Sequence, residues 1–64
     1  MCEANAYLVN REGKEDLLLS DVDLIEPQSD GKIRLVSIYG EQKVLKAKIK
    51  SMSLVNHRVV LAEK

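Results

Sequence analysis

Short stretches in which apolar and polar side chains alternate cover most of the chain. In the clearest one, residues 45–51, small or apolar side chains alternate with three lysines, Lys46, Lys48 and Lys50. A period of two places successive side chains on opposite faces of a strand. This stretch therefore predicts a β-strand with one face toward the core and a lysine-bearing face toward solvent.

Five other short stretches have strand character, namely residues 4–9, 17–19, 21–26, 33–39 and 58–62. In the third, we expect Val22 and Leu24 to face inward, and Pro27 to end the strand. Turn sequences separate the stretches, at Gly13, at the Asp-Gly pair before Lys32, at Gly40 and around residues 55–57. Five or six short strands without a convincing helix predict an all-β fold, a small antiparallel barrel formed by a single domain, 1–64.

The stretch 33–39 is apolar on both faces of the expected strand. Ile33, Leu35 and Tyr39 mark one face, and Val36 and Ile38 mark the other. A small barrel has only one interior, so the second face indicates either a partner surface or a covering loop.

The composition favours self-association. The chain has 64 residues, one cysteine and neither phenylalanine nor tryptophan, so the core must be aliphatic and no internal disulfide can form. A chain this short is marginally stable alone, and forming a homodimer is the obvious remaining stabiliser.

The charge and hydropathy patterns limit the partners and the location. Ten basic and ten acidic residues cancel, which gives no electrostatic reason to expect nucleic acid or a membrane as partner. No apolar run approaches the length of a signal-peptide core or a membrane span. We therefore expect a soluble, cytoplasmic protein in which the single thiol stays reduced.

The first three residues, Met1, Cys2 and Glu3, are the candidate metal site. Cys2 is the only cysteine, and it lies beside the α-amino group and the first backbone amides. If Met1 is removed, the donors are the Cys2 amine and thiolate; if it is kept, they are the Met1 amine, the Cys2 amide nitrogen and the thiolate. Such planar nitrogen and sulfur sets suit Ni(II) or Cu(II) better than tetrahedral Zn(II). The alternative is an inert chain end.

Two other features carry competing interpretations. His57, the only imidazole, lies beside a turn, where a surface or hydrogen-bonding role is favoured over metal ligation. The lysine row could bind RNA, but only Tyr7 and Tyr39 are available to stack on bases, so a solvated face that protects a strand edge is the better interpretation. No nucleophile and base are arranged as in a catalytic motif, which argues against an enzyme.

Several segments together resemble one known family. They are the Met-Cys start, Val9-Asn10-Arg11, Asp21-Val22, the hairpin from Asp30 to Leu35, Gly40-Glu41 and the stretch from Leu54 to Leu61. The combination of length, second-position cysteine and hairpin order is similar to the CooT family of small accessory proteins for carbon monoxide dehydrogenase maturation.

The resemblance implies a fold, a ligand and partners. It implies an SH3-like barrel, a homodimer, and Ni(II) held by Cys2 for delivery to carbon monoxide dehydrogenase or its maturation proteins. The family's occasional description as RNA-binding is weak support for the lysine-row alternative.

Overall fold

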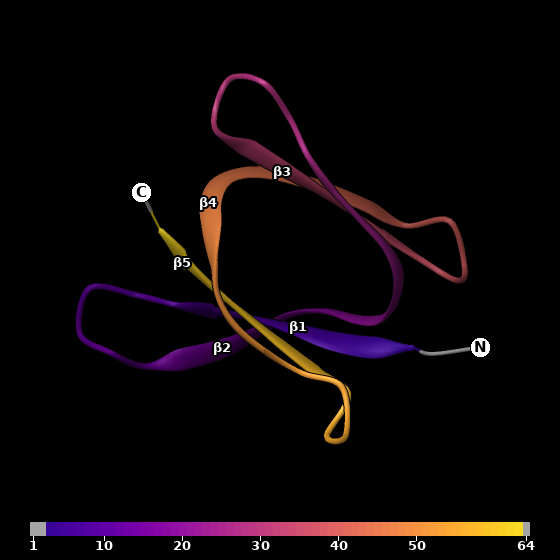
Figure 1. Ribbon diagram of the computed structural model, residues 1–64, viewed down its shortest axis with the longest axis horizontal. Coiled ribbons are helices and arrows are strands. Elements are labelled where there is room, and N and C mark those ends of the chain that lie inside the picture. Colours follow the sequence, from indigo (N-terminus) through magenta and orange to yellow (C-terminus); the bar gives the residue numbers. More distant parts are fainter. Residues whose placement is uncertain (1–2, 64) are drawn as a thin grey trace.

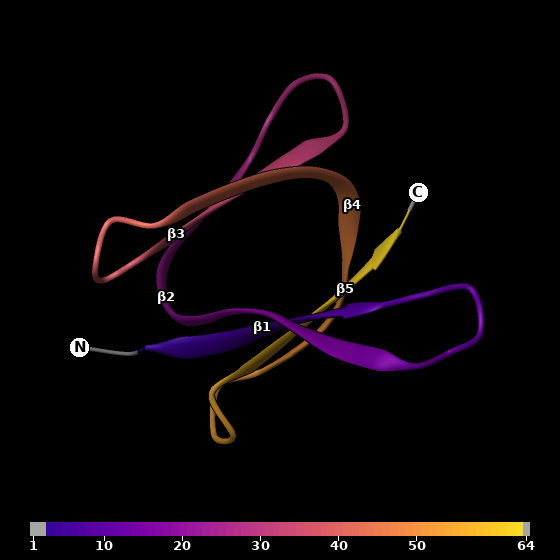
Figure 2. The same cartoon turned by 180° about the vertical axis from the view of Figure 1, so that it is seen from behind.

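The computed structural model describes residues 3–63, which form five strands and no helix. The strands are β1 (Ala4–Val9), β2 (Glu15–Pro27), β3 (Lys32–Ser37), β4 (Gln42–Ser53) and β5 (Arg58–Glu63). They close into a small barrel, seen from its two sides in Figures 1 and 2. The predicted all-β barrel is confirmed. In the described part of the chain, no helix is long and apolar enough to cross a membrane.

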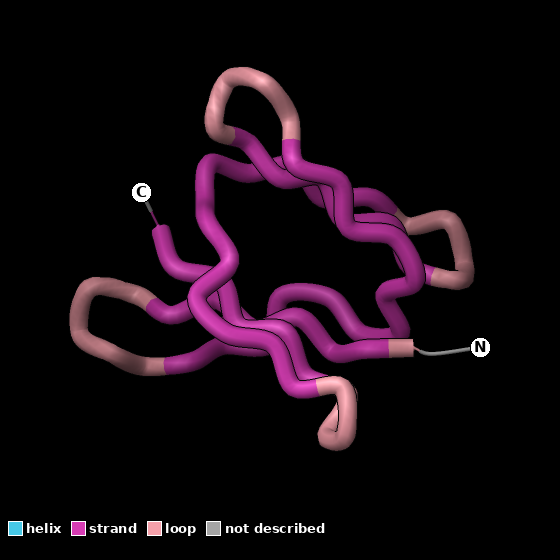
Figure 3. The backbone as a smooth tube through the Cα atoms, in the orientation of Figure 1, coloured by secondary structure: helices cyan, strands magenta, loops and turns pink. Residues whose placement is uncertain are grey.

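Two long, bent strands allow so few strands to close a ring. β2 pairs with β1 along one part and with β3 along the other, and β4 likewise divides its length between β3 and β5. Figure 3 shows the resulting ring, with loops projecting outward from it. Four neighbouring pairs are antiparallel, whereas β1 and β5 close the ring in parallel.

The bend in β2 lies at Asp21, whose backbone is left-handed with φ of 55°. Two strands were expected here, but the chain continues through the bend as one strand, and the pairing with β3 shifts between Val22 and Leu24. Beyond this shift, the alternation of inward-facing and outward-facing side chains along β2 is reversed. Val22 is buried as predicted, but the prediction for Leu24 was wrong, because its side chain is 41% exposed and Ile25 packs against the core instead.

The turn between β2 and β3 contains the predicted Asp-Gly hairpin. Gly31 has a φ of 82°, which residues other than glycine rarely adopt, and its amide donates to the Gln28 carbonyl. The Gln28 amide in turn donates to the Lys32 carbonyl at 2.7 Å. The turn is therefore closed by backbone hydrogen bonds at the point where β3 begins.

The core is aliphatic, as the composition requires. Ala6, Leu35 and Leu61 are completely buried, and other aliphatic side chains surround them. β3 ends at Ser37, which is buried and accepts hydrogen bonds from the Tyr39 and Glu41 amides. The placement of Tyr39 on one strand face with Ile33 and Leu35 was therefore wrong. The strand has already ended at that residue, and the tyrosine is 73% exposed.

Candidate metal centre

The described chain begins with Glu3, the last of the three predicted metal-site residues. The other two, Met1 and Cys2, lie outside the described residues. Glu3 is exposed and leads directly into β1. The position of β1 in the ring therefore determines where the N-terminal segment meets the barrel.

Two contacts attach the start of the described chain, residues 3–5, to the turn that joins β4 to β5. The Asn5 amide donates to the His57 carbonyl at 2.8 Å, and His57 Nδ1 lies 3.1 Å from the Glu3 carbonyl oxygen. The carbonyl can only accept, so this hydrogen bond requires the proton on Nδ1. In the neutral ring, Nε2 then keeps its lone pair, which is the arrangement found in histidines that bind metals.

His57 is held by an unusual local backbone. Its φ is 53°, a left-handed conformation in which histidine is enriched among residues other than glycine. Just before it, the Asn56 amide donates to the Ser53 hydroxyl oxygen at 3.3 Å, within the same turn. The side chain is exposed and hydrogen-bonded, as the sequence favoured.

Charged and aromatic groups stabilise the first residue of β5. The Arg58 guanidinium lies 4.5 Å from the centre of the Tyr7 ring and pairs with the Glu15 carboxylate. A cation over an aromatic face is favourable by about 0.5–1 kcal/mol at exposed sites. This arrangement joins β1, β2 and β5 directly beside His57.

Metal-binding side chains are not clustered elsewhere in the described chain. Within residues 3–63, no group of three or more histidine, cysteine, aspartate or glutamate side chains could hold a metal ion. Of the residues considered from the sequence, the structure brings together Glu3 and His57. Their separation of 54 positions hid this relationship from any reading of local patterns.

The lysine row lies exposed on β4, as predicted. However, β4 lies between β3 and β5 in the ring, so it is not a terminal strand that needs protection along its whole length. Tyr7 already lies under Arg58, and Tyr39 is in the turn after β3. Nothing in this arrangement supports the RNA-binding alternative, which requires bases stacked on aromatic rings.

Comparison with known proteins identifies the family. The family model described as CO dehydrogenase accessory protein CooT matches residues 1–62. The chain belongs to the CooT family. A solved structure, a putative CooT from Carboxydothermus hydrogenoformans, is 46% identical, with a TM-score of 0.88 and 98% of each chain covered. No curated protein matches the chain.

Membership of the CooT family confirms the resemblance drawn from the sequence. The matched range includes position two, so the second-position cysteine lies within the family region. CooT is an accessory protein of carbon monoxide dehydrogenase, and this chain is therefore assigned to that accessory family.

Proposed function

We propose that this CooT protein binds Ni(II) at its N-terminus through Cys2 and delivers the ion to carbon monoxide dehydrogenase or its maturation proteins in the cytoplasm. The observation that supports the proposal most is the family match from residue 1 to residue 62, with a lone cysteine at the second position. The protein acts as a carrier, with Ni(II) as its cargo, and catalyses no reaction.

The chemistry of the terminus suits this cargo. The α-amino nitrogen and the Cys2 thiolate provide two donors, and a retained Met1 adds the Cys2 amide nitrogen between them. Deprotonated amide nitrogen and thiolate ligands favour a planar geometry, which Ni(II) accepts more readily than Zn(II) does. The thiolate is the ligand, so binding releases protons and weakens in acid.

The barrel contributes an anchor for the terminus. Because Glu3 and Asn5 are both bonded to His57, the N-terminal segment starts from a fixed place at the β4–β5 turn. We assign His57 as a positioning residue and leave nickel ligation to the terminus itself. A site at an exposed chain end suits a carrier, because a recipient protein can approach the metal directly.

We also propose that two copies associate through the outer face of β2, β3 and β4. Leu24 of β2 is paired with Val36 of β3, and Arg34 of β3 is paired with Val44 of β4. Leu24 and Val44 are 41% and 52% exposed, a large fraction for aliphatic side chains. Ile38, just beyond the end of β3, is also exposed, at 37%.

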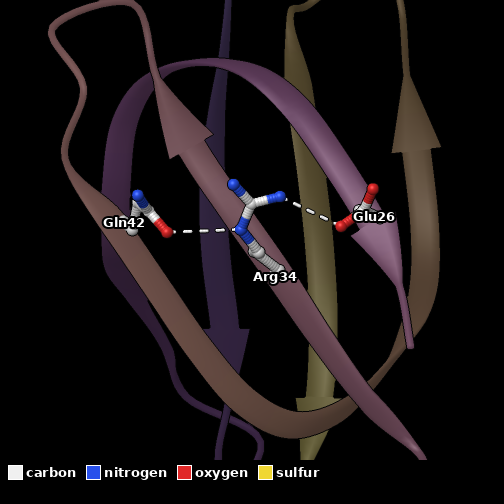
Figure 4. A network of polar contacts seen from close by, with 3 residues as sticks. All are labelled: Glu26, Arg34 and Gln42. Carbon is white, nitrogen blue, oxygen red and sulfur yellow. Dashed lines mark hydrogen bonds and ion pairs between the residues drawn. The ribbon is translucent and has the colours of Figure 1, made fainter. Parts of the chain in front are cut away.

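A polar network lies within this outer face. Arg34 donates to Glu26 at 3.0 Å and to Gln42 at 3.2 Å, from the strands on either side (Figure 4). These bonds use two of the five guanidinium N–H groups and pair its charge with the Glu26 carboxylate within the chain, so no carboxylate of a partner is needed to balance the charge. The aliphatic side chains around it can then pack against a second copy without leaving a buried charge unpaired.

An absorption titration with Ni(II) tests the proposed function. Thiolate-to-nickel charge transfer should appear in the near ultraviolet and saturate at a defined ratio of metal to protein. The experiment requires untagged protein, because added histidines bind nickel themselves. Saturable Ni(II) binding without any thiolate charge-transfer band would contradict binding at Cys2.

A further inference from the structure

A groove opens on the side of the barrel where β3 begins. It has a volume of about 270 Å³ and lies between the β2–β3 turn and the middle of β4. Aliphatic groups line most of it, and they come from Pro27, Ile33, Ala47 and Ile49. Gln28, Gly31, Lys32 and Lys48 complete the lining, so an apolar hollow lies beside two lysines.

This groove is remote from the N-terminal segment. Ala47, in its lining, pairs with Glu63 at the far end of β5, whereas Glu3 lies beside His57, before β5 begins. Figures 1 and 2 agree that the β2–β3 turn and the end of β5 lie away from the start of β1. The groove therefore requires an explanation separate from the proposed metal site.

Along the groove, β4 has a strand edge without a partner. The pairing of β3 with β4 ends at Lys32 and Lys46. In the described chain, residues 47–49 pair with β5 on one side and have no strand partner toward the β2–β3 turn. An unpaired strand edge presents amide and carbonyl groups that an extended peptide can complete.

Charge is segregated between β2 and β4. β2 carries five carboxylates and no basic side chain, whereas β4 carries four lysines and no acidic one. Arg34 and Arg58 pair with carboxylates of β2. No lysine of β4 forms an ion pair with another residue in the range 3–63. Lys32 forms one exposed ion pair, in which its Nζ lies 3.6 Å from Asp30 Oδ2, and such surface pairs contribute little stability.

We propose that the groove binds an extended acidic segment of a partner protein along the open edge of β4. A volume near 270 Å³ suits one or two aliphatic side chains, whereas sites for whole small molecules are commonly larger. The aliphatic anchor of the segment enters the hollow, and its flanking carboxylates meet Lys32, Lys46 and Lys48. The backbone edge of residues 47–49 aligns the segment.

The chemistry of the lining distinguishes this occupant from the alternatives. RNA requires aromatic surfaces on which bases stack, and the groove has none among its lining residues. A second copy of the chain would have to insert its own acidic strand β2, which is already paired with β1 and β3. A free acidic segment satisfies the charge, the hollow and the open edge together.

The test uses a short synthetic peptide with one leucine flanked by glutamates and aspartates, labelled for fluorescence anisotropy. Two matched peptides replace the leucine by serine or the acids by their amides. We expect the first peptide to bind and to shift the amide resonances of Ile33, Ala47 and Ile49. Each matched peptide should bind at least about tenfold more weakly.

Charge-reversal variants test the protein side. Lys46→Glu combined with Lys48→Glu should lower the affinity for the acidic peptide by about tenfold or more, because carboxylates of the protein and the peptide would then repel each other. Arg11→Glu combined with Lys14→Glu reverses the same amount of charge on the exposed β1–β2 turn and should leave the affinity unchanged. Amide spectra of both variants verify that the barrel is intact.

Four outcomes would overturn the proposal. They are failure of the acidic peptide to bind, resonance shifts away from the groove, equal weakening by both charge-reversal variants, and lysine-dependent binding of a uridine oligomer in place of the peptide. Because Cys2 is unchanged in these variants, nickel binding is tested separately from the groove.

Discussion

His57 lies against Glu3, with Nδ1 of the ring 3.1 Å from the Glu3 carbonyl oxygen, across 54 positions of sequence. The only imidazole of the chain is thereby located at the residue that follows Cys2. The hydrogen bond gives a histidine at a left-handed backbone position a structural role beside the proposed site, because it ties Glu3 to the β4–β5 turn. It fixes where the N-terminal segment leaves the barrel.

The role of the thiol can be separated from that of His57. Cys2→Ser should abolish specific Ni(II) binding and leave the fold intact, because it removes the only thiolate donor. His57→Gly should have a much smaller effect on Ni(II) affinity. It removes only the hydrogen bond from the ring to the Glu3 carbonyl, and glycine adopts the left-handed backbone of this position without strain. Isothermal titration with Ni(II) measures both variants, and circular dichroism verifies the fold.

The result for His57 also tests its assignment as a positioning residue. An equal loss of Ni(II) affinity in the two variants would make His57 a ligand. Wild-type affinity in the serine variant would remove Cys2 from the site altogether.

The sequence predicted the barrel because alternation and turn residues are local signals. The glycine turns, the bounds of β1 and the lysine face of β4 all depend on neighbours within a few positions. The bend at Asp21 did not show, because a left-handed aspartate inside a strand leaves no mark in the hydrophobic pattern. The shift in pairing between Val22 and Leu24 left no mark either, and it is this shift that turns Leu24 outward against the prediction.

The site was less accessible from the sequence than the fold. The proposed metal chemistry of Cys2 rests on its position and uniqueness, which are visible in the sequence. The contact of Glu3 with His57 depends on the parallel closure of β1 against β5. Such a pairing between the first and last strands is non-local, and no spacing rule reports it.

The bend in β2 should be sensitive to the residue at position 21. Asp21→Gly should preserve or slightly raise the stability, because glycine adopts a φ of 55° without strain. Asp21→Val should lower it by roughly 1–2 kcal/mol, since a β-branched residue is disfavoured in the left-handed region. Thermal unfolding followed by circular dichroism compares the two, and equal melting temperatures would argue against strain at this bend.

The proposed dimer interface can be broken by a single charge. Wild-type protein should sediment at twice the 7.2 kDa chain mass at micromolar concentration. Val36→Lys places a charge between Leu24 and Gln42 on the outer face and should yield monomers. Val55→Lys, at an 88% exposed position in the β4–β5 turn, is the matched control and should remain dimeric. A stable wild-type monomer would refute the interface.

The α-amino nitrogen is predicted to be the second nickel donor. A free α-amino group has a reference pKa of about 8 and binds metal only when unprotonated, so Ni(II) affinity should rise as the pH increases through neutrality. A short extension before Met1, free of histidine, converts this amine into an amide. Chain ends tolerate additions, so the extended protein should fold normally.

The extended protein should bind Ni(II) at least about tenfold more weakly, because Cys2 keeps its thiolate but loses a chelating partner. Acetylation of the native terminus removes the same lone pair without adding residues, and it should give the same loss. Paired absorption titrations of native, extended and acetylated protein measure the effect. Matching affinities and spectra would show that the amine is not a ligand. The donors would then have to come from two Cys2 thiolates and amide nitrogens across a dimer, or from Cys2 with His57.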